Sequence, residues 1–228
     1  MSIENFYEIM PTKFKDLPTP NPNKHLHGFD IPFRLCCVAP SGSGKSNFVT
    51  NLISLFSQGH GTFKLVFIVC KDKEEALYKF LASKSDQIQV VEGLHSLPML
   101  DSFDRENASL VIIDDMMLEK NQEKVCQYYI RCRKKNVSIA YLAQSYFVIP
   151  KVVRSNSNYL VLLKLSGDRD LNLILRENSL GVDKNTMLNL YKYATCEKFS
   201  PFIIDIESPD DDRKYRKGLL EYLSPKDF

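Results

Sequence analysis

The stretch CCVAPSGSGKSNFV, residues 36–49, joins an apolar run to a glycine-containing turn and then to Lys45 and Ser46. The apolar run at 33–38 has the length of a strand. After the turn, apolar residues at positions 48, 49, 52, 53, 55 and 56 recur at helical spacing. A strand, a Gly/Ser turn ending in Lys-Ser and a helix are the setting that a phosphate-binding loop requires.

Each residue type in this loop has a defined task on a nucleotide. Gly42 and Gly44 allow backbone N–H groups to turn inward around an anion, and the helix N-terminus adds partial positive charge. Lys45 is expected to reach the β- and γ-phosphates, and Ser46 to hold Mg²⁺. The nucleotide-binding residues predicted here are Ala39, Pro40, Ser41, Gly42, Ser43, Gly44, Lys45, Ser46 and Asn47.

One position departs from the usual pattern. Ala39 stands where such loops begin with glycine, at the exit of the strand, where we expect a methyl group to be tolerated. The alternative is a Gly/Ser-rich surface turn with a stray lysine. Agreement between the loop and both flanking elements favours the phosphate loop.

Bulk properties set the class of protein. The chain has 228 residues, 44% hydrophobic and 25% charged, which is typical of one large or two small globular domains. Its net charge of +2 does not by itself indicate nucleic acid, so any basic surface must be local. No apolar run reaches membrane-spanning length, the N-terminus lacks a secretory layout, and the six cysteines lack metal spacing. We therefore expect a chain kept in a reducing compartment, with no membrane partner and with cysteines that are small buried hydrophobes.

The rest of the chain alternates between strands and helices. Strands are predicted at 33–38, 63–70, 88–91, 109–114, 137–144, 159–164 and 201–206, and further helices at 73–83, 119–135, 168–178 and 183–194. Near-continuous apolar strands of this kind predict an α/β sandwich with a mostly parallel central sheet. We divide the chain into an extended, proline-rich arm at 1–30, an ATPase domain at 31–206 and a charged, peripheral tail at 207–228.

A second strand supplies carboxylates. LVIIDDMM, residues 110–117, is an apolar strand that ends in Asp114 and Asp115. A strand-end aspartate beside a phosphate loop is expected to hold Mg²⁺, and we assign this role to Asp114. Asp115 is the candidate base that orients or activates the attacking water. The alternative for the pair is a solvated strand end.

Two polar features follow at and before the strand 137–144. Gln144, at its end, is a candidate contact for the γ-phosphate or the attacking water, although spacing alone makes it no more than a polar strand end. The basic run at 131–135 precedes this strand, and it suits a helix C-terminus, a DNA-backbone contact or an arginine finger for a neighbouring subunit. For the finger we favour Arg133, then Arg154, with Arg169 as a further candidate.

With these features in hand, the chain resembles the FtsK–HerA superfamily of DNA-pumping ATPases, and within it the poxvirus-type DNA-packaging ATPases of large DNA viruses, virophages and related elements. The likeness extends from about residue 32 to about residue 206. It is carried by the stretches PFRLCCVAPSGSGKSNFV, LVIIDDMM, RCRKKNVSIAYLAQSYFVIPKVVRSNSNYLVLL and SGDRDLNLI.

The resemblance implies a fold, a cargo and a set of partners. It implies a RecA-like (ASCE) P-loop core, a three-layer sandwich with an extra strand between the loop strand and the acidic strand, and Gln144 as a sensor at a strand end. It implies ATP with Mg²⁺, a homo-oligomeric ring of five or six subunits, and double-stranded DNA held by its backbone without sequence readout. A capsid or portal-vertex partner and a place in the cytoplasm of an infected host cell, in the viral factory or with the virion, are further implications.

Other functions remain open at this point. A small-molecule P-loop kinase uses the same loop, although we find no arginine-rich lid segment, and the DD and Gln arrangement suits water better than an acceptor hydroxyl. A weakly hydrolysing nucleotide-binding structural subunit is suggested by Asp115, because many hydrolysing relatives have Glu there. A related translocase of conjugation or secretion is the third alternative.

Overall fold

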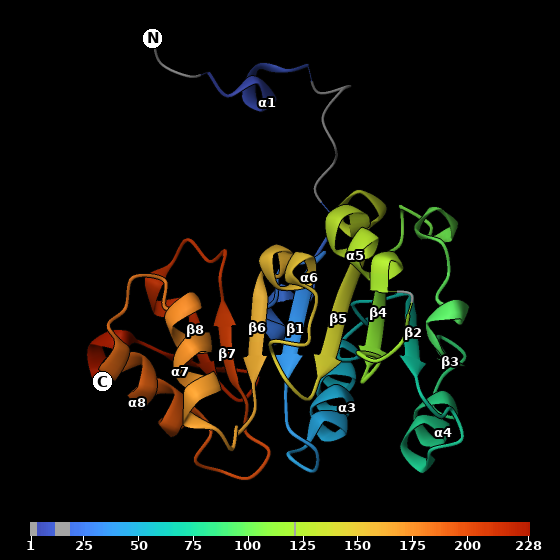
Figure 1. The fold of residues 1–228 in the computed structure, drawn as a ribbon. Helices are drawn as coiled ribbons and strands as arrows, with labels where there is room; N and C mark the ends of the chain where they lie inside the picture. The colour runs from blue at the N-terminus through green and yellow to red at the C-terminus, as the bar shows by residue number, and fades with distance from the viewer. Residues whose placement is uncertain (1–3, 12–18, 121) are drawn as a thin grey trace.

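A computed structural model describes residues 4–11, 19–120 and 122–228. Within these residues nine strands form one sheet, in the order β3-β2-β4-β5-β1-β6-β7-β8-β9, with helices on both faces (Figure 1). The strands are β1 (Arg34–Val38), β2 (Leu65–Cys70), β3 (Ile88–Glu92), β4 (Ser109–Asp114), β5 (Val137–Ala143), β6 (Tyr159–Leu162), β7 (Phe202–Asp205), β8 (Tyr215–Lys217) and β9 (Glu221–Leu223).

The α-helices of the described residues are short. They are α1 (Phe6–Ile9), α2 (Lys24–His27), α3 (Lys45–Phe56), α4 (Ala76–Ala82), α5 (Gln122–Arg131), α6 (Lys151–Asn156), α7 (Asp168–Glu177) and α8 (Lys184–Ala194). One 3₁₀ turn that matters below is η4 (Cys132–Lys135). Four helices predicted from the sequence after residue 60 are present as α4, α5, α7 and α8, and α6 was not predicted.

The sheet has a parallel part and an antiparallel part. The six strands from β3 to β6 run parallel, and β7, β8 and β9 continue the sheet in antiparallel pairing. All seven predicted strands are present. β5 lies between β1 and β4, which confirms the extra strand expected between the loop strand and the acidic strand. The carboxyl ends of β1, β2, β4 and β5 therefore meet at one edge of the sheet, where ligands of such folds bind.

Two hydrophobic layers hold the helices to the sheet. Along β1 and β5, every residue is buried, so side chains enter the core on both faces. One layer packs apolar residues of α5, α6, α7 and α8 against the sheet, and the other packs those of α3 and α4 against its opposite face. The structure is thus the three-layer sandwich that the sequence predicted.

The C-terminal residues differ from the expected peripheral tail. β8 and β9 extend the sheet, and Tyr215 is 0% and Arg216 1% exposed. The Arg216 guanidinium donates hydrogen bonds to the carbonyl oxygens of His27 (3.2 Å) and Gly28 (2.7 Å) and lies 4.5 Å from the ring centroid of Phe29. The sequence suggested that this charged segment faces solvent, but the Arg216 guanidinium is buried. Its hydrogen bonds connect β8 to the residues before β1.

The N-terminal prediction is tested only in part. Residues 12–18, which include Pro18 of the expected arm, lie outside the described residues. Residues 24–27 form the one-turn helix α2, and His27 and Phe29 are fully buried against Phe56 of α3. This part of the arm packs on its own domain, and His27 is a packing residue. The boundaries of the three segments stay a prediction.

The structure also gives the burial of the cysteines and the length of the helices. Cys36, Cys37, Cys70 and Cys132 are buried, Cys126 is half-buried and Cys196 is exposed, and all six are free thiols. Across residues 4–11, 19–120 and 122–228, no helix has both the length and the apolar character needed to cross a bilayer.

Candidate nucleotide-binding site

The phosphate loop connects β1 to α3. Backbone and side chain both shape it: the Ser43 N–H (3.1 Å) and the Ser43 hydroxyl (2.6 Å) donate to the carbonyl oxygen of Pro40. Gly42 and Gly44 have φ angles of 74° and 107°, a region that side-chain-bearing residues rarely adopt. α3 begins at Lys45, so the loop ends at a helix N-terminus whose backbone N–H groups face an incoming anion.

The structure explains the departure at Ala39. Its side chain is 0% exposed and packs in the core layer beneath α3, and its N–H donates to Ala143 of β5 at 3.0 Å. Ala39 is not among the described non-glycine residues with positive φ. Since neither its φ angle nor its surroundings demand glycine, the methyl group is accommodated.

The remaining loop residues lie where the sequence predicted them. Lys45 Nζ donates to the carbonyl oxygen of Ala39 at 3.4 Å, which keeps the ammonium over the loop. Ser46 and Asn47 form the first turn of α3; Ser46 is half-buried and Asn47 is exposed. Gly42 has no atom within 4 Å of the place a Cβ would take, so that part of the loop is open to a ligand.

Asp114 lies at the end of β4, and its two carboxylate oxygens have different surroundings. The Tyr78 hydroxyl, from α4, donates to Oδ2, while Oδ1 is buried with no hydrogen-bond partner among the described residues. Burial raises the pKa of Asp114, and the Tyr78 hydrogen bond and the Lys45 charge oppose that rise. A buried carboxylate oxygen without a partner is rare in proteins, and here it fits a ligand that the loop would bring.

This donor set suits Mg²⁺. A carboxylate at Asp114 and a hydroxyl at Ser46 are hard oxygen ligands, and Mg²⁺ is usually held by one or two protein groups together with phosphate oxygens and water. The residues present therefore fit the metal that the phosphate loop implies.

Asp115 accepts a hydrogen bond from one amide and forms an ion pair with one ammonium group, each from the end of a neighbouring strand. Its Oδ2 accepts a hydrogen bond from Gln144 Nε2 at 2.6 Å, and Lys71 Nζ lies 3.7 Å away. Its Oδ1, like that of Asp114, is buried without a partner among the described residues. The φ of Asp115 is 57°, a strained value for a non-glycine residue, and its N–H donates to Leu142 of β5 at 3.0 Å.

Two residues of this site were missed in the sequence. Tyr78 lies on a predicted helix with no motif around it, and only the fold brings its hydroxyl to Asp114. Lys71 is the first residue after β2, and because β2 pairs with β4 in parallel, its position at the carboxyl end of a neighbouring strand was a usable signal. Gln144, by contrast, was a predicted site residue; it lies directly after β5, and its amide contacts Asp115.

Arg133 and Arg154, the two favoured finger candidates, are not brought to this site of their own chain. Arg133 is exposed on η4, before the amino end of β5; because β5 runs parallel to β1, this is the opposite edge of the sheet from the phosphate loop. Arg154, on α6, donates to the carbonyl oxygen of Ile149 at 3.2 Å, pairs with Glu177 at 3.5 Å and lies 4.8 Å from the ring centroid of Tyr146.

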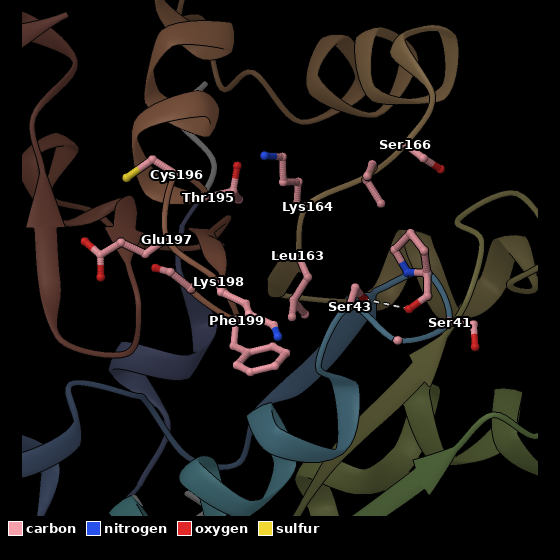
Figure 2. A pocket seen from close by; sticks show the side chains of 14 residues that line it. Ser41, Ser43, Leu163, Lys164, Ser166, Thr195, Cys196, Glu197, Lys198 and Phe199 are labelled. Atoms are coloured by element: carbon pink, nitrogen blue, oxygen red, sulfur yellow. Dashed lines mark hydrogen bonds between the residues drawn. The ribbon is translucent and has the colours of Figure 1, made fainter.

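A cleft of about 610 Å³ opens beside the phosphate loop. Figure 2 shows Ser41 and Ser43 on one side, Phe199 on the other and Leu163 between them. The cleft is formed by the loop, by the segment after β6 and by the connection from α8 to β7.

Known proteins share the sequence features and the fold of this chain. Residues 25–207 match the family model described as "Poxvirus A32 protein". The chain belongs to this family. The match includes the phosphate loop, both aspartates and Gln144. No curated protein gave a significant sequence match.

Solved structures share the fold at low sequence identity. The genome packaging NTPase B204 from Sulfolobus turreted icosahedral virus 2, in complex with sulfate, has a TM-score of 0.59 and 15% identity, over 85% of this chain and 100% of that one. The AMPPCP complex of the same protein has a TM-score of 0.57 and 15% identity, over 79% and 96%. The cytoplasmic domain of the Type VII secretion ATPase EccC from Thermomonospora curvata has a TM-score of 0.55 and 12% identity, over 84% of this chain and 25% of that one.

Proposed function

We propose that this chain is an ATPase that drives double-stranded DNA into a preformed viral capsid. The observation that carries the proposal is its membership of the poxvirus A32 family over residues 25–207. The fold is also that of B204, a genome packaging NTPase whose structures hold sulfate or AMPPCP.

Each residue of the site has a task in this proposal. The loop N–H groups and Lys45 would bind the ATP phosphates, and Ser46 and Asp114 would hold Mg²⁺, which when bound would neutralise phosphate charge. Asp115 orients the attacking water in line with the γ-phosphorus through its unpartnered Oδ1. Catalysis of this kind depends on positioning and electrostatics, for which rigid strand ends are suited.

Gln144 links the base to the segment that follows it. Its amide donates to Asp115 and its backbone leads into residues 145–154, which return to β6 through α6. Loss of the γ-phosphate is proposed to release this segment as a switch that moves DNA.

The motor requires partners that complete it. We propose a ring of five or six copies in which a neighbouring subunit supplies an arginine to each nucleotide. Arg133 is the first choice because it is exposed, whereas Arg154 is engaged within its own chain. DNA would be held by its backbone through the other basic residues of the run 131–135 and through Lys151. A capsid or portal-vertex protein would dock the ring in the cytoplasmic viral factory or on the virion.

The first test is steady-state ATP hydrolysis with and without long double-stranded DNA, over a range of protein concentrations. A DNA-coupled ring is expected to turn over faster with DNA and faster per subunit at higher concentration. Turnover indifferent to both, also after procapsids are added, would refute the proposal. Transfer of phosphate to an added nucleoside would indicate a kinase instead.

Two substitutions test the site itself. Lys45→Ala is expected to abolish ATP binding and hydrolysis, because the phosphate charge loses its cation. Asp115→Asn is expected to abolish hydrolysis while ATP binding is retained, since the amide cannot accept the water's proton. Normal turnover by Asp115→Asn would show that the base is elsewhere, and tight ATP binding with slow, DNA-independent turnover in the unsubstituted chain would favour a structural nucleotide-binding subunit.

A further inference from the structure

Phe199 packs directly on the phosphate loop. It lies in the connection between α8 and β7, and a Cβ built on Gly44 would fall 2.4 Å from its ring carbon Cδ1. The glycine before Lys45 thus leaves space for an aromatic ring as well as for the turn. Phe199 itself has a φ of 68°, and a bulky residue keeps such a strained backbone only where its surroundings hold it there.

The ring is nevertheless open to the cleft. Phe199 is 41% exposed, and Figure 2 shows it opposite Ser41 and Ser43 across the cleft described above. The volume of about 610 Å³ lies within the range of small-molecule sites, and buried Leu163 gives the cleft an apolar floor next to the polar loop. A nucleotide whose phosphates sit in the loop extends its sugar and base into space of this kind.

We propose that Phe199 stacks against the base of the bound nucleotide, an inference that rests on the proposed function of the loop. An exposed aromatic face beside an apolar floor matches a nucleobase, which is flat, with apolar faces and polar edges. Lys198 Nζ lies 4.9 Å from the ring centroid, and since this side chain is exposed it can exchange its place with the base. Stacking accepts any base, so this residue supplies affinity rather than base choice.

A purely structural role for Phe199 has a different signature. If the ring only braces Gly44, its removal distorts the loop and weakens every ligand that binds through phosphates. If it stacks on a base, its removal weakens only ligands that carry one. Inorganic tripolyphosphate, which has the phosphates and no base, separates the two roles.

The test compares calorimetric binding of a non-hydrolysable ATP analogue and of tripolyphosphate, both with Mg²⁺. For Phe199→Ala we expect a loss of about 10- to 100-fold for the ATP analogue, the usual effect of removing a base–aromatic stack, and less than a two-fold change for tripolyphosphate. Phe80→Ala is the matched control, because Phe80 is also exposed (51%) and has a lysine, Lys84, 4.5 Å from its ring centroid. Phe80→Ala is expected to change neither the affinity for the ATP analogue nor the affinity for tripolyphosphate.

The absence of tryptophan from the chain allows a second readout. Phe199→Trp introduces a single indole, whose fluorescence should be quenched by the ATP analogue and not by tripolyphosphate, while Phe80→Trp should not respond. An equal loss of both ligands in Phe199→Ala, or no loss of either, would overturn the inference while the proposed function stands. An unsubstituted chain that binds neither ligand would overturn both.

Discussion

Removal of one hydroxyl tests how Asp114, the proposed metal ligand, is held. Tyr78→Phe keeps the ring of a side chain that is 2% exposed and deletes the donor to Asp114 Oδ2. Asp114 is 9% exposed and its Oδ1 already lacks a partner among the described residues, so the variant leaves the whole carboxylate without a direct side-chain donor.

The expected loss of stability follows from the negative charge of the acceptor, the Asp114 carboxylate. A hydrogen bond to a charged group contributes about 1.5–3 kcal/mol, and about 2 kcal/mol lowers the Tm of a chain of this size by roughly 4–8 °C. Loss of the group that orients a metal ligand typically weakens metal affinity about 10- to 100-fold. We therefore expect Tyr78→Phe to need at least about ten-fold more Mg²⁺ for nucleotide binding, with no change in nucleotide affinity in EDTA.

The control is Tyr128→Phe, which removes a hydroxyl of equal burial from a neutral acceptor. Tyr128 is 1% exposed and donates to the carbonyl oxygen of Pro98 at 2.8 Å. We expect a stability loss of about 1 kcal/mol and an unchanged Mg²⁺ requirement. The assay is a Mg²⁺ titration of fluorescent-nucleotide binding beside thermal unfolding of each variant. If Tyr78→Phe and Tyr128→Phe shift the Mg²⁺ midpoint equally, Tyr78 does not position Asp114.

Four further predictions come from the same contacts. Asp114→Asn should raise the Tm of the ligand-free protein at neutral pH, because burial raises the pKa of Asp114 in the folded state and its ionisation makes folding less favourable as the pH rises from the unfolded pKa through the folded pKa. The gain in Tm should shrink in acid, and an unchanged Tm at neutral pH would contradict the prediction. Burial also lowers the pKa of His27 to about 4 from 6.5, so roughly 3 kcal/mol of stability should be lost as pH falls from 6.5 to 4, and His27→Asn should flatten that part of the pH profile in urea titrations. Arg216→Ala should cost roughly 3–5 kcal/mol, because it leaves Asp205 buried beside the empty place; a urea midpoint within error of the unsubstituted protein would rule this out. Gly44→Ala should abolish binding of both ATP and tripolyphosphate, since φ and Phe199 both exclude a Cβ, and retained calorimetric binding would show that the loop can relax.

The sequence predicted the parallel half of the fold well, for a physical reason. Its strands are buried on both faces, so they read as continuous apolar runs, and turn residues mark their ends. α6 was missed because six residues after Pro150 are too few to show a helical period. β8 and β9 were missed because their charges suggested solvent, whereas Arg216 is buried between aromatic rings and backbone carbonyls.

The residues of the site also fall into a predicted group and a group that was missed. The loop, Asp114, Asp115 and Gln144 stand at strand ends, and the sequence order of a parallel sheet is enough to bring them to one edge. Tyr78 and Phe199 reach the site through helix and loop packing, with 36 residues separating Tyr78 from its partner Asp114, and no local pattern encodes such a contact. The roles of the predicted site residues remain predictions that the variants above address.

The position of β1 in the sheet governs when the phosphate loop can form during synthesis. Arg34 pairs with Ile139 and Leu35 pairs with Tyr159, so both neighbours of this early strand leave the ribosome long after it. Such non-local pairing is slow, and unpaired apolar strands are prone to aggregation. A nascent chain that ends before β6 therefore carries an unsupported loop with one open edge of β1, whereas β7, β8 and β9 join as successive antiparallel neighbours once β6 is in place. Nucleotide is thus expected to protect the chain from proteolysis only after residues beyond 162 have emerged.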